Sequence, residues 1–185
     1  MALEHALLVS LREQPASGLE LAKRFSRSIG YFWHATHQQI YRVLARMDDD
    51  GWVTVTEVPQ TGRPDKKVHA VTPLGERVLA DWLATPTPME PLRSELAVKM
   101  RGASYGDRAA LLDVVRANLA DHQIRLDHYR QLEKRHRADR DPARETLTDH
   151  ALDQYLVLRG GIRIEEFWVD WLTEYLTAHE ARLTR

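Results

Sequence analysis

The sequence predicts a mainly α-helical protein of two domains, an α+β domain at residues 1–84 and a domain of long helices at residues 92–185. Three observations support this fold class. In residues 1–84, three helical periods are followed by two alternating β-branched stretches and a further helix. Residues 85–91 contain three prolines, and a helix cannot continue through such a linker. Beyond the linker, apolar residues recur at spacings of three and four over long segments, as in packed helices.

Composition agrees with an intracellular binding protein. With 185 residues, 43% of them hydrophobic, the chain can bury one good core or two small ones. The absence of cysteine excludes disulfides, thiolate metal sites and a cysteine nucleophile, and it favours a reducing compartment. Glu4 and His5 interrupt the first apolar residues, and no apolar run approaches the roughly 20 residues of a membrane span. We therefore expect a cytoplasmic protein with neither a signal peptide nor a membrane contact.

The first two helices are delimited by a proline and by a capping signature. The first is expected from Ala2 to Glu13, where apolar residues fall at helical spacing until Pro15 stops it. Ser17 and Glu20 then form a capping box, because the hydroxyl can accept from first-turn amides while the carboxylate returns to the amide of the cap. The second helix should run from there to about Ser28.

Thr36 and Gln39 repeat the capping signature, so a third helix should begin at Thr36. Four apolar residues of this helix form one stripe for the core: Ile40, Val43, Leu44 and Met47. The opposite face and its flank are polar or cationic apart from one alanine: Gln38, Tyr41, Arg42, Ala45, Gln39 and Arg46. Glutamine can pair with adenine, arginine with guanine or phosphate, and tyrosine with phosphate. Each residue type is also common on a solvated helix. The neighbouring segments must therefore show whether this face reads DNA or only contacts solvent.

A strand pair with a cationic turn supplies that context. Residues 52–58 alternate as a strand should, residues 59–65 form a turn, and residues 66–71 form the partner strand. Thr72 and Pro73 then cap and start a fourth helix. Three helices, a hairpin and a helix form a winged helix-turn-helix, in which the cations of the wing can bind a flanking phosphate or minor groove: Arg63, Lys66 and Lys67. The alternative is that these cations only keep an edge strand soluble.

Charge is distributed unevenly. The formal net charge of 26 minus 27, or −1, is not that of a non-specific nucleic-acid binder. Between Lys23 and Met47, however, there are five lysines and arginines and no carboxylate, and the acidic run Asp48 to Asp50 follows at once. The positive charge is therefore local to the expected helix-turn-helix.

Four segments together resemble PadR-family transcriptional regulators, and most of all the branch typified by the virulence activator AphA. They are residues 30–42 (Gly-Tyr-Phe-Trp-His-Ala-Thr-His-Gln-Gln-Ile-Tyr-Arg), 51–53, 62–67 and 72–75. The resemblance is close over roughly the first 100 residues and architectural beyond them. It implies a homodimeric regulator with a helical C-terminal dimerisation domain. The expected DNA contacts are Thr36, His37, Gln38, Gln39, Tyr41, Arg42 and Arg46 from the third helix and Arg63, Lys66 and Lys67 from the wing.

The second domain supports dimerisation by its own pattern. We expect helices from Leu92 to about Gly102, from Asp107 to about Ala138, and from about Ala143 to Leu183. The middle helix carries a heptad seam with one histidine: Leu112, Val115, Leu119, His122, Leu126 and Tyr129. The last has a broader apolar face: Leu152, Leu156, Ile162, Phe167, Val169, Leu172 and Leu176. Helices of this length cannot bury both faces in one small domain, so a second copy should cover the remainder, with His122 as an interface histidine.

Two features of the helical domain allow sharper hypotheses. Gly160 and Gly161 inside a helix each cost about 1 kcal/mol relative to alanine, so a close helix approach or a kink should compensate. Aromatic residues could line a pocket for a flat aromatic effector, as the resemblance to ligand-responsive regulators suggests: Trp82, Tyr155, Trp168 and Trp171, with Phe167 and Tyr175. The alternative, that these rings fill a dimer interface, is favoured because aromatic residues at helical spacing are more often core than pocket.

Catalysis and metal binding have little support. His34 and His37 could share a helical face with zinc, but no third ligand is near in sequence. The side chains of Asp48, Asp49 and Asp50 diverge on a helix, so we expect a solvated helix end and not a magnesium site. We therefore expect no enzyme and no cofactor. Two hypotheses stand: a dimeric regulator that reads a pseudo-palindromic operator in double-stranded DNA, and a protein-interaction adaptor whose winged helix does not bind DNA.

Overall fold

The computed structural model describes residues 3–25, 35–62, 65–89, 93–138 and 148–183, and all structural statements below concern these ranges. The chain forms two compact units, residues 1–89 and 90–185, whose boundary falls inside the proline-containing linker. Each unit is described by itself. Among the described residues, no helix is both long and apolar enough to cross a membrane.

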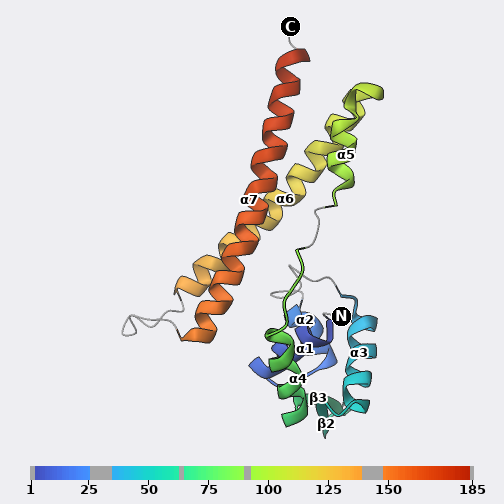
Figure 1. Cartoon of the computed structure of the whole chain (residues 1–185), viewed down its shortest axis with the longest axis vertical. Coiled ribbons are helices and arrows are strands. Elements are labelled where there is room, and N and C mark those ends of the chain that lie inside the picture. Colours follow the sequence, from blue (N-terminus) through green and yellow to red (C-terminus); the bar gives the residue numbers. More distant parts are fainter. Residues whose placement is uncertain (1–2, 26–34, 63–64, 90–92, 139–147, 184–185) are drawn as a thin grey trace. The chain divides into compact units, whose positions relative to one another are not determined.

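The first unit is the predicted winged helix-turn-helix (Figure 1). Its helices and strands follow in the expected order: α1 Leu3–Glu13, α2 Gly18–Phe25, α3 His37–Asp49, β2 Val53–Val58, β3 Lys66–Val71 and α4 Pro73–Leu83. The predicted extension of α2 to Ser28 lies outside the described residues. The predicted fold class, mainly helical with a small α+β winged helix, is confirmed.

The sequence did not predict the two-residue strand β1, Ala16–Ser17, which pairs antiparallel with β3. It places β3 in the middle of a three-stranded sheet of order β1-β3-β2. Two residues are too short to show an alternating pattern, which explains why sequence periodicity could not reveal them. This strand joins the start of α2 to the wing, because Ser17 is both the last residue of β1 and the cap of α2.

Both predicted capping boxes are present. The amide of Thr36 donates to Gln39 Oε1 at 2.8 Å, and the amide of Gln39 donates to Thr36 Oγ1 at 3.2 Å. At α2, the amide of Ser17 donates to Glu20 Oε2 at 2.9 Å, and the amide of Glu20 donates to Ser17 Oγ at 3.4 Å. Each box satisfies two otherwise free amides and fixes where its helix begins.

The core of the first unit explains how α3 is held. Apolar side chains from α1, α2, α3, β2 and α4 form one buried cluster: Leu7, Leu8, Leu11, Leu21, Phe25, Ile40, Leu44, Met47, Val53 and Leu79. Three of the four stripe residues predicted on α3 are fully buried in this cluster, and Val43 is half-buried. The buried stripe therefore turns the opposite face of α3 outward.

The second unit consists of α5 Glu95–Arg101, a short 3-10 turn, and the long helices α6 Arg108–Ala138 and α7 Asp149–Leu183, which pack against each other (Figure 1). Helix α5 begins three residues later than predicted, because Ser94 is its cap and accepts from the amide of Ala97 at 3.1 Å. The predicted start of the last helix at Ala143 lies outside the described residues.

The heptad seam of α6 faces α7 of the same chain. Leu112, Val115, Leu126 and Tyr129 are buried there, opposite buried residues of α7: Ile162, Leu172 and Leu176. The sequence predicted this seam, assigned the remaining apolar faces to a partner copy, and named His122 as an interface histidine. A heptad period shows that one helix packs on another, but it cannot show whether the second helix belongs to the same chain.

His69 gives the first unit a pH-dependent stability. It lies in the middle strand β3, opposite Ala16 on one side and Val55 on the other, and it is buried. Burial lowers the pKa of His69 below 6.5, an effect that Lys67 reinforces and that Asp48 and a backbone contact with Ala16 oppose. The unfolded chain then binds a proton more readily than the folded chain, so this contribution to stability is present above about pH 6.5 and is lost as the pH falls.

We expect wild type to lose free energy of unfolding more steeply than His69→Gln between pH 7 and pH 5. Denaturant unfolding at several pH values measures this difference, and His37→Gln, at an exposed position of α3, is the matched control that should keep the wild-type slope. Equal slopes for wild type and His69→Gln would show that folding does not lower the pKa of this histidine.

Candidate nucleic-acid interface

The outward face of α3 is exposed along its whole length. Thr36, His37, Gln38, Gln39, Tyr41, Arg42 and Arg46 are all solvent-exposed. Seven of the ten predicted DNA-contacting residues are therefore exposed on α3 and its cap. Their surroundings differ, however, and the contacts within the chain separate them into two kinds.

Arg42 and Gln38 are uncommitted. Among the described residues, no hydrogen bond or ion pair engages either side chain. Both project from α3 on the side opposite Ile40 and Leu44, whose burial fixes the orientation of the helix. A guanidinium group and a carboxamide free on one rigid helix face are suitable donors and acceptors for base edges and phosphates.

Arg46 is committed to a contact inside the domain. Its Nη2 lies 3.0 Å from Oε1 of Glu4 on α1, and the Glu4 side chain is only 6% exposed. A nearly buried carboxylate needs a charged partner, so Arg46 stabilises the packing of α1 on α3. Sequence reasoning grouped Arg46 with Arg42 because Glu4 is remote in the chain.

Thr36 and Gln39 are partly committed as well. The hydroxyl of Thr36 and the carbonyl oxygen of Gln39 are both used in the capping box. Gln39 retains its amide donor, while the cap itself leaves first-turn amides of α3 directed outward. The capping box therefore leaves these two side chains fewer free groups than Gln38 or Arg42.

The wing cations divide in the same way. Lys66 Nζ lies 2.7 Å from Oε1 of Glu20 on α2, and Lys66 is the less exposed of the two lysines. Lys67 Nζ lies 3.7 Å from Oε1 of Glu57, its cross-strand neighbour, with both side chains about two-thirds exposed. Lys67 is therefore only loosely held, whereas Lys66 joins the end of β3 next to the turn to α2. Arg63 lies outside the described residues.

Glu20 is the acceptor on which this junction depends. Its carboxylate receives the Lys66 ammonium and the amide and hydroxyl of Ser17. The hydrogen bond from Lys66, followed by that from the Ser17 amide, lowers the pKa of Glu20 to about 2. Because the folded pKa lies below the unfolded one, this contribution to stability is present above about pH 4.5 and is lost as the pH falls toward 2.

Glu20→Gln is expected to lower the free energy of unfolding at pH 7 by no more than about 1 kcal/mol, because the Glu20 carboxylate is 45% exposed and solvent screens it. The difference from wild type should shrink progressively below pH 4.5. Denaturant unfolding at pH 7, 4 and 2.5 checks both statements. The matched control is Glu57→Gln, which removes the looser partner of Lys67 and should change stability less at every pH.

Within the second unit, the residues predicted to line an effector pocket do not all gather in one place. Trp82 belongs to the first unit and stacks on His5 at 4.5 Å between ring centroids. Tyr155 stacks on His136 and lies thirteen residues before Trp168 on α7, a distance of about 20 Å along the helix. Trp168 and Trp171 do meet, at 5.3 Å between ring centroids.

Sequence reasoning named Phe167, Trp168 and Trp171 together, but it did not place His122 of α6 against them. Trp168 stacks on His122 of α6 at 5.1 Å, and Phe167 lies within 6 Å of both tryptophans. His122 in turn has its Nδ1 2.5 Å from Oε2 of the buried Glu165. The seam histidine therefore has its partners within its own chain, and the signal that could have located them was Glu165 on the inner face of α7.

Comparison with known proteins supports the interpretation of this chain as a transcriptional regulator. The Transcriptional regulator PadR-like family matches residues 7–81, and the Virulence activator alpha C-term family matches residues 92–180. A probable transcriptional regulator of Mycobacterium tuberculosis, Rv1176c, is 54% identical over 96% of this chain and 97% of its own length. The negative transcriptional regulator PadR of Bacillus subtilis is 29% identical over 94% of this chain and 95% of its own.

The chain belongs to the PadR-like family of transcriptional regulators.

Solved structures agree with this membership. Bacillus subtilis PadR in complex with operator DNA superposes with a TM-score of 0.82 and 28% identity, over 96% of this chain and 97% of that one. PadR has also been solved in complex with p-coumaric acid, with a TM-score of 0.73 and 27% identity over 96% of this chain and 94% of that one. The Vibrio cholerae virulence activator AphA gives a TM-score of 0.77 and 29% identity over 97% and 99% of the two chains. The predicted resemblance to PadR-family regulators and their AphA-like branch is confirmed.

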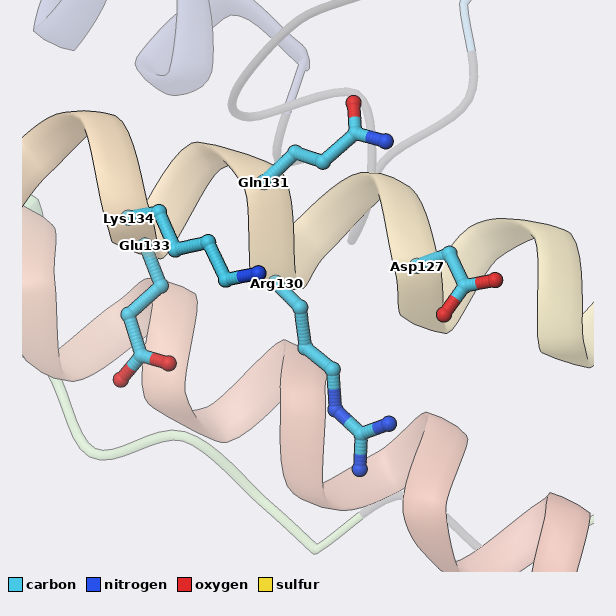
Figure 2. Close-up of a pocket in the computed structure, with 5 residues that line it drawn as sticks. All are labelled: Asp127, Arg130, Gln131, Glu133 and Lys134. Carbon is cyan, nitrogen blue, oxygen red and sulfur yellow. The ribbon is translucent and has the colours of Figure 1, made fainter.

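PadR-family proteins are regulators and not enzymes, as the sequence predicted. A polar hollow on the described surface of the second unit is shown in Figure 2, and its lining residues all belong to α6: Asp127, Arg130, Gln131, Glu133 and Lys134. Arg130 reaches Oε1 of Glu166 on α7 at 3.2 Å. This charged hollow contains none of the predicted effector residues. Within the described ranges, no three His, Asp or Glu side chains gather as a metal site requires, and His34 lies outside those ranges.

Proposed function

We propose that this PadR-family regulator binds a pseudo-palindromic operator as a homodimer, with α3 in the major groove and the wing on the flanking backbone. The observation that carries this proposal is the outward face of α3, whose Arg42 and Gln38 side chains no other described residue engages. The operator complex of Bacillus subtilis PadR, which superposes over nearly the whole chain, supports the same use of the fold. Such a regulator works in the cytoplasm, where it meets its DNA.

The contacts proposed for α3 follow from the hydrogen-bond donors and acceptors that each side chain leaves unpaired. Gln38 and Arg42 would contact base edges, because their donors and acceptors are unoccupied and a recognition helix reads the groove with such groups. Tyr41 and His37 would contact phosphate beside them, together with the first-turn amides after Thr36. Lys67 and Arg63 would supply the wing contacts, whereas Arg46 and Lys66 mainly hold their elements in place.

The face of α7 turned away from α6 suits a second copy of the chain. Its exposed large apolar residues lie within an arc of roughly 140° on the helix: Leu152, Leu156, Val157, Ile164 and Phe167. Gly160 lies within the same arc, and a Cβ there would meet nothing within 4 Å, so a partner helix has room to approach closely. A partner helix at this place would supply the close approach that Gly160 allows, while Gly161 is buried within its own chain. The sustained exposure of large apolar side chains favours an interface.

Ile164→Asp is expected to convert the dimer to a monomer, because it places a charge among apolar side chains at the interface. Light scattering across a concentration series measures the mass. Ile124→Asp is the control, since Ile124 is exposed on the face of α6 that points away from α7. A dimer that survives Ile164→Asp would place the interface elsewhere on the chain.

The experiment that tests the proposed function titrates the protein with fluorescent duplexes from its own upstream region and with scrambled duplexes, at two salt concentrations. We expect tight, sequence-selective binding with two protomers per site and a steep loss of affinity with salt, because phosphate contacts release counterions. Equal weak binding of both duplexes, or none, would favour the protein-interaction adaptor, since an adaptor has no phosphate contacts to lose.

A small aromatic effector is the second part of this proposal, supported by the complex of Bacillus subtilis PadR with p-coumaric acid. The cluster that the structure assembles from Phe167, Trp168 and Trp171 offers aromatic surface for such a compound. Titration of p-coumaric acid into the protein–DNA complex tests it: release of DNA supports an effector of this class, and unchanged binding assigns these rings to packing.

A further inference from the structure

Gly18 and Tyr41 meet where the two helices of the helix-turn-helix approach each other. Gly18 is the first residue of α2, and Tyr41 lies on the outward face of α3. A Cβ at Gly18 would lie 2.4 Å from Cε1, 2.9 Å from Cδ1 and 3.0 Å from Cζ of Tyr41. Carbon atoms in contact are ordinarily about 3.5 to 4.0 Å apart, so any side chain at residue 18 would overlap the ring.

Backbone conformation does not explain a glycine at this position. Among the described residues, only Gly51 and Gly62 have a positive φ. Any residue could therefore adopt the backbone of Gly18, and space for the Tyr41 ring is the reason that remains. The missing side chain of Gly18 leaves room that the ring occupies.

The surroundings of Gly18 are fixed. Ser17 before it and Glu20 after it form the capping box of α2, and Glu20 also binds Lys66 at the start of β3. The first turn of α2 is thus tied to β3 on one side and contacts the Tyr41 ring on the other. The ring is therefore placed against a rigid support.

We propose that Gly18 is a positioning residue for DNA recognition, which by having no side chain seats the Tyr41 ring where its hydroxyl can bind a phosphate of the operator. This inference rests on the proposed DNA binding. Tyr41 is 49% exposed, and an exposed side chain must be ordered when DNA binds, at a cost in conformational entropy. A ring that already rests on α2 avoids much of that cost, so the contact is stronger than that of a freely rotating tyrosine.

The test is a double-mutant cycle on operator affinity with wild type, Gly18→Ala, Tyr41→Ala and the double variant. The Tyr41 ring can turn toward solvent, so Gly18→Ala should fold with nearly the wild-type melting temperature yet bind operator about tenfold more weakly, the effect of one lost hydrogen bond to a charged group. Tyr41→Ala should weaken binding by a similar factor. The double variant should bind no more weakly than Tyr41→Ala, because Gly18 acts only through the ring.

Gly106→Ala is the matched control, since a Cβ at Gly106 would meet nothing within 4 Å, and it should leave operator affinity unchanged. The inference would be overturned if Gly18→Ala bound operator as tightly as wild type. It would also be overturned if the double variant lost as much affinity as the two single losses multiplied together, because the two residues would then act independently. So would a Gly18→Ala protein that unfolds while the double variant is stable, because the contact would then serve packing. If Tyr41→Ala binds operator as tightly as wild type, this inference fails but the proposed DNA binding stands. If wild type does not select operator DNA over scrambled DNA, the proposed function itself fails.

Discussion

Replacing Arg42 by alanine is expected to weaken operator binding by about 10- to 100-fold while leaving the melting temperature nearly unchanged. The reason is that Arg42 is exposed on α3 and, among the described residues, has no partner whose loss could unfold the protein. Its guanidinium is therefore available in full to a guanine or a phosphate. Titration with the operator duplex and thermal unfolding of the same preparation check the two halves of the expectation.

Arg46→Ala provides the contrast, because the same substitution one turn further along α3 removes a structural contact. It leaves the nearly buried carboxylate of Glu4 without its partner, and we expect the free energy of unfolding to fall by about 1 to 3 kcal/mol, since Arg46 itself is partly exposed. The double variant with Glu4→Gln should recover part of this loss. An Arg42→Ala protein that unfolds, or an Arg46→Ala protein that is stable but fails to bind DNA, would reverse the two assignments.

The difference between these two arginines shows which parts of the site could be predicted from sequence. Helical period located the outward face of α3, and the capping box at Thr36 located its start, because both depend on residues within one or two turns. The partner of Arg46 lies on α1, at Glu4, and the partner of Lys66 lies on α2, at Glu20. Such ion pairs depend on how the helices and strands pack, so no local sequence pattern predicts them.

The helical domain illustrates the same limit. The heptad spacing from Leu112 to Tyr129 correctly predicted a packed seam on α6, but the seam packs on α7 of its own chain. A second apolar face of α7, around Ile164 and Phe167, is the one left for a partner copy. The sequence contained both apolar faces. Only the packing of α6 on α7 shows which face is covered within the chain and which is left exposed.

Gly75→Ala is expected to destabilise the first unit by about 2 to 4 kcal/mol, because the added methyl group has no space. A Cβ at Gly75 would lie 2.2 Å from the carbonyl oxygen of Trp52 and 2.9 Å from Cγ1 of Val71. The Trp52 oxygen belongs to the backbone, and it accepts from the amide of Thr72 at 3.0 Å and from its hydroxyl at 3.2 Å. Unlike the Tyr41 ring at Gly18, this obstacle cannot rotate away.

The overlap in Gly75→Ala should displace the wing as well as lower the free energy of unfolding. Trp52 leads into β2 and Thr72 follows β3, so a shift of α4 that relieves the overlap would also pull on both strands of the hairpin. Since alanine is ordinarily the better helix residue by about 1 kcal/mol, a destabilisation at this position has to come from the overlap. Denaturant unfolding measures it, with Arg77→Ala, an exposed neighbour on α4, as the control expected to change stability by less than about 0.5 kcal/mol. A Gly75→Ala protein as stable as wild type would mean that α4 can move on the hairpin at no cost, and the wing would then not be the rigid element that the proposed DNA contact requires.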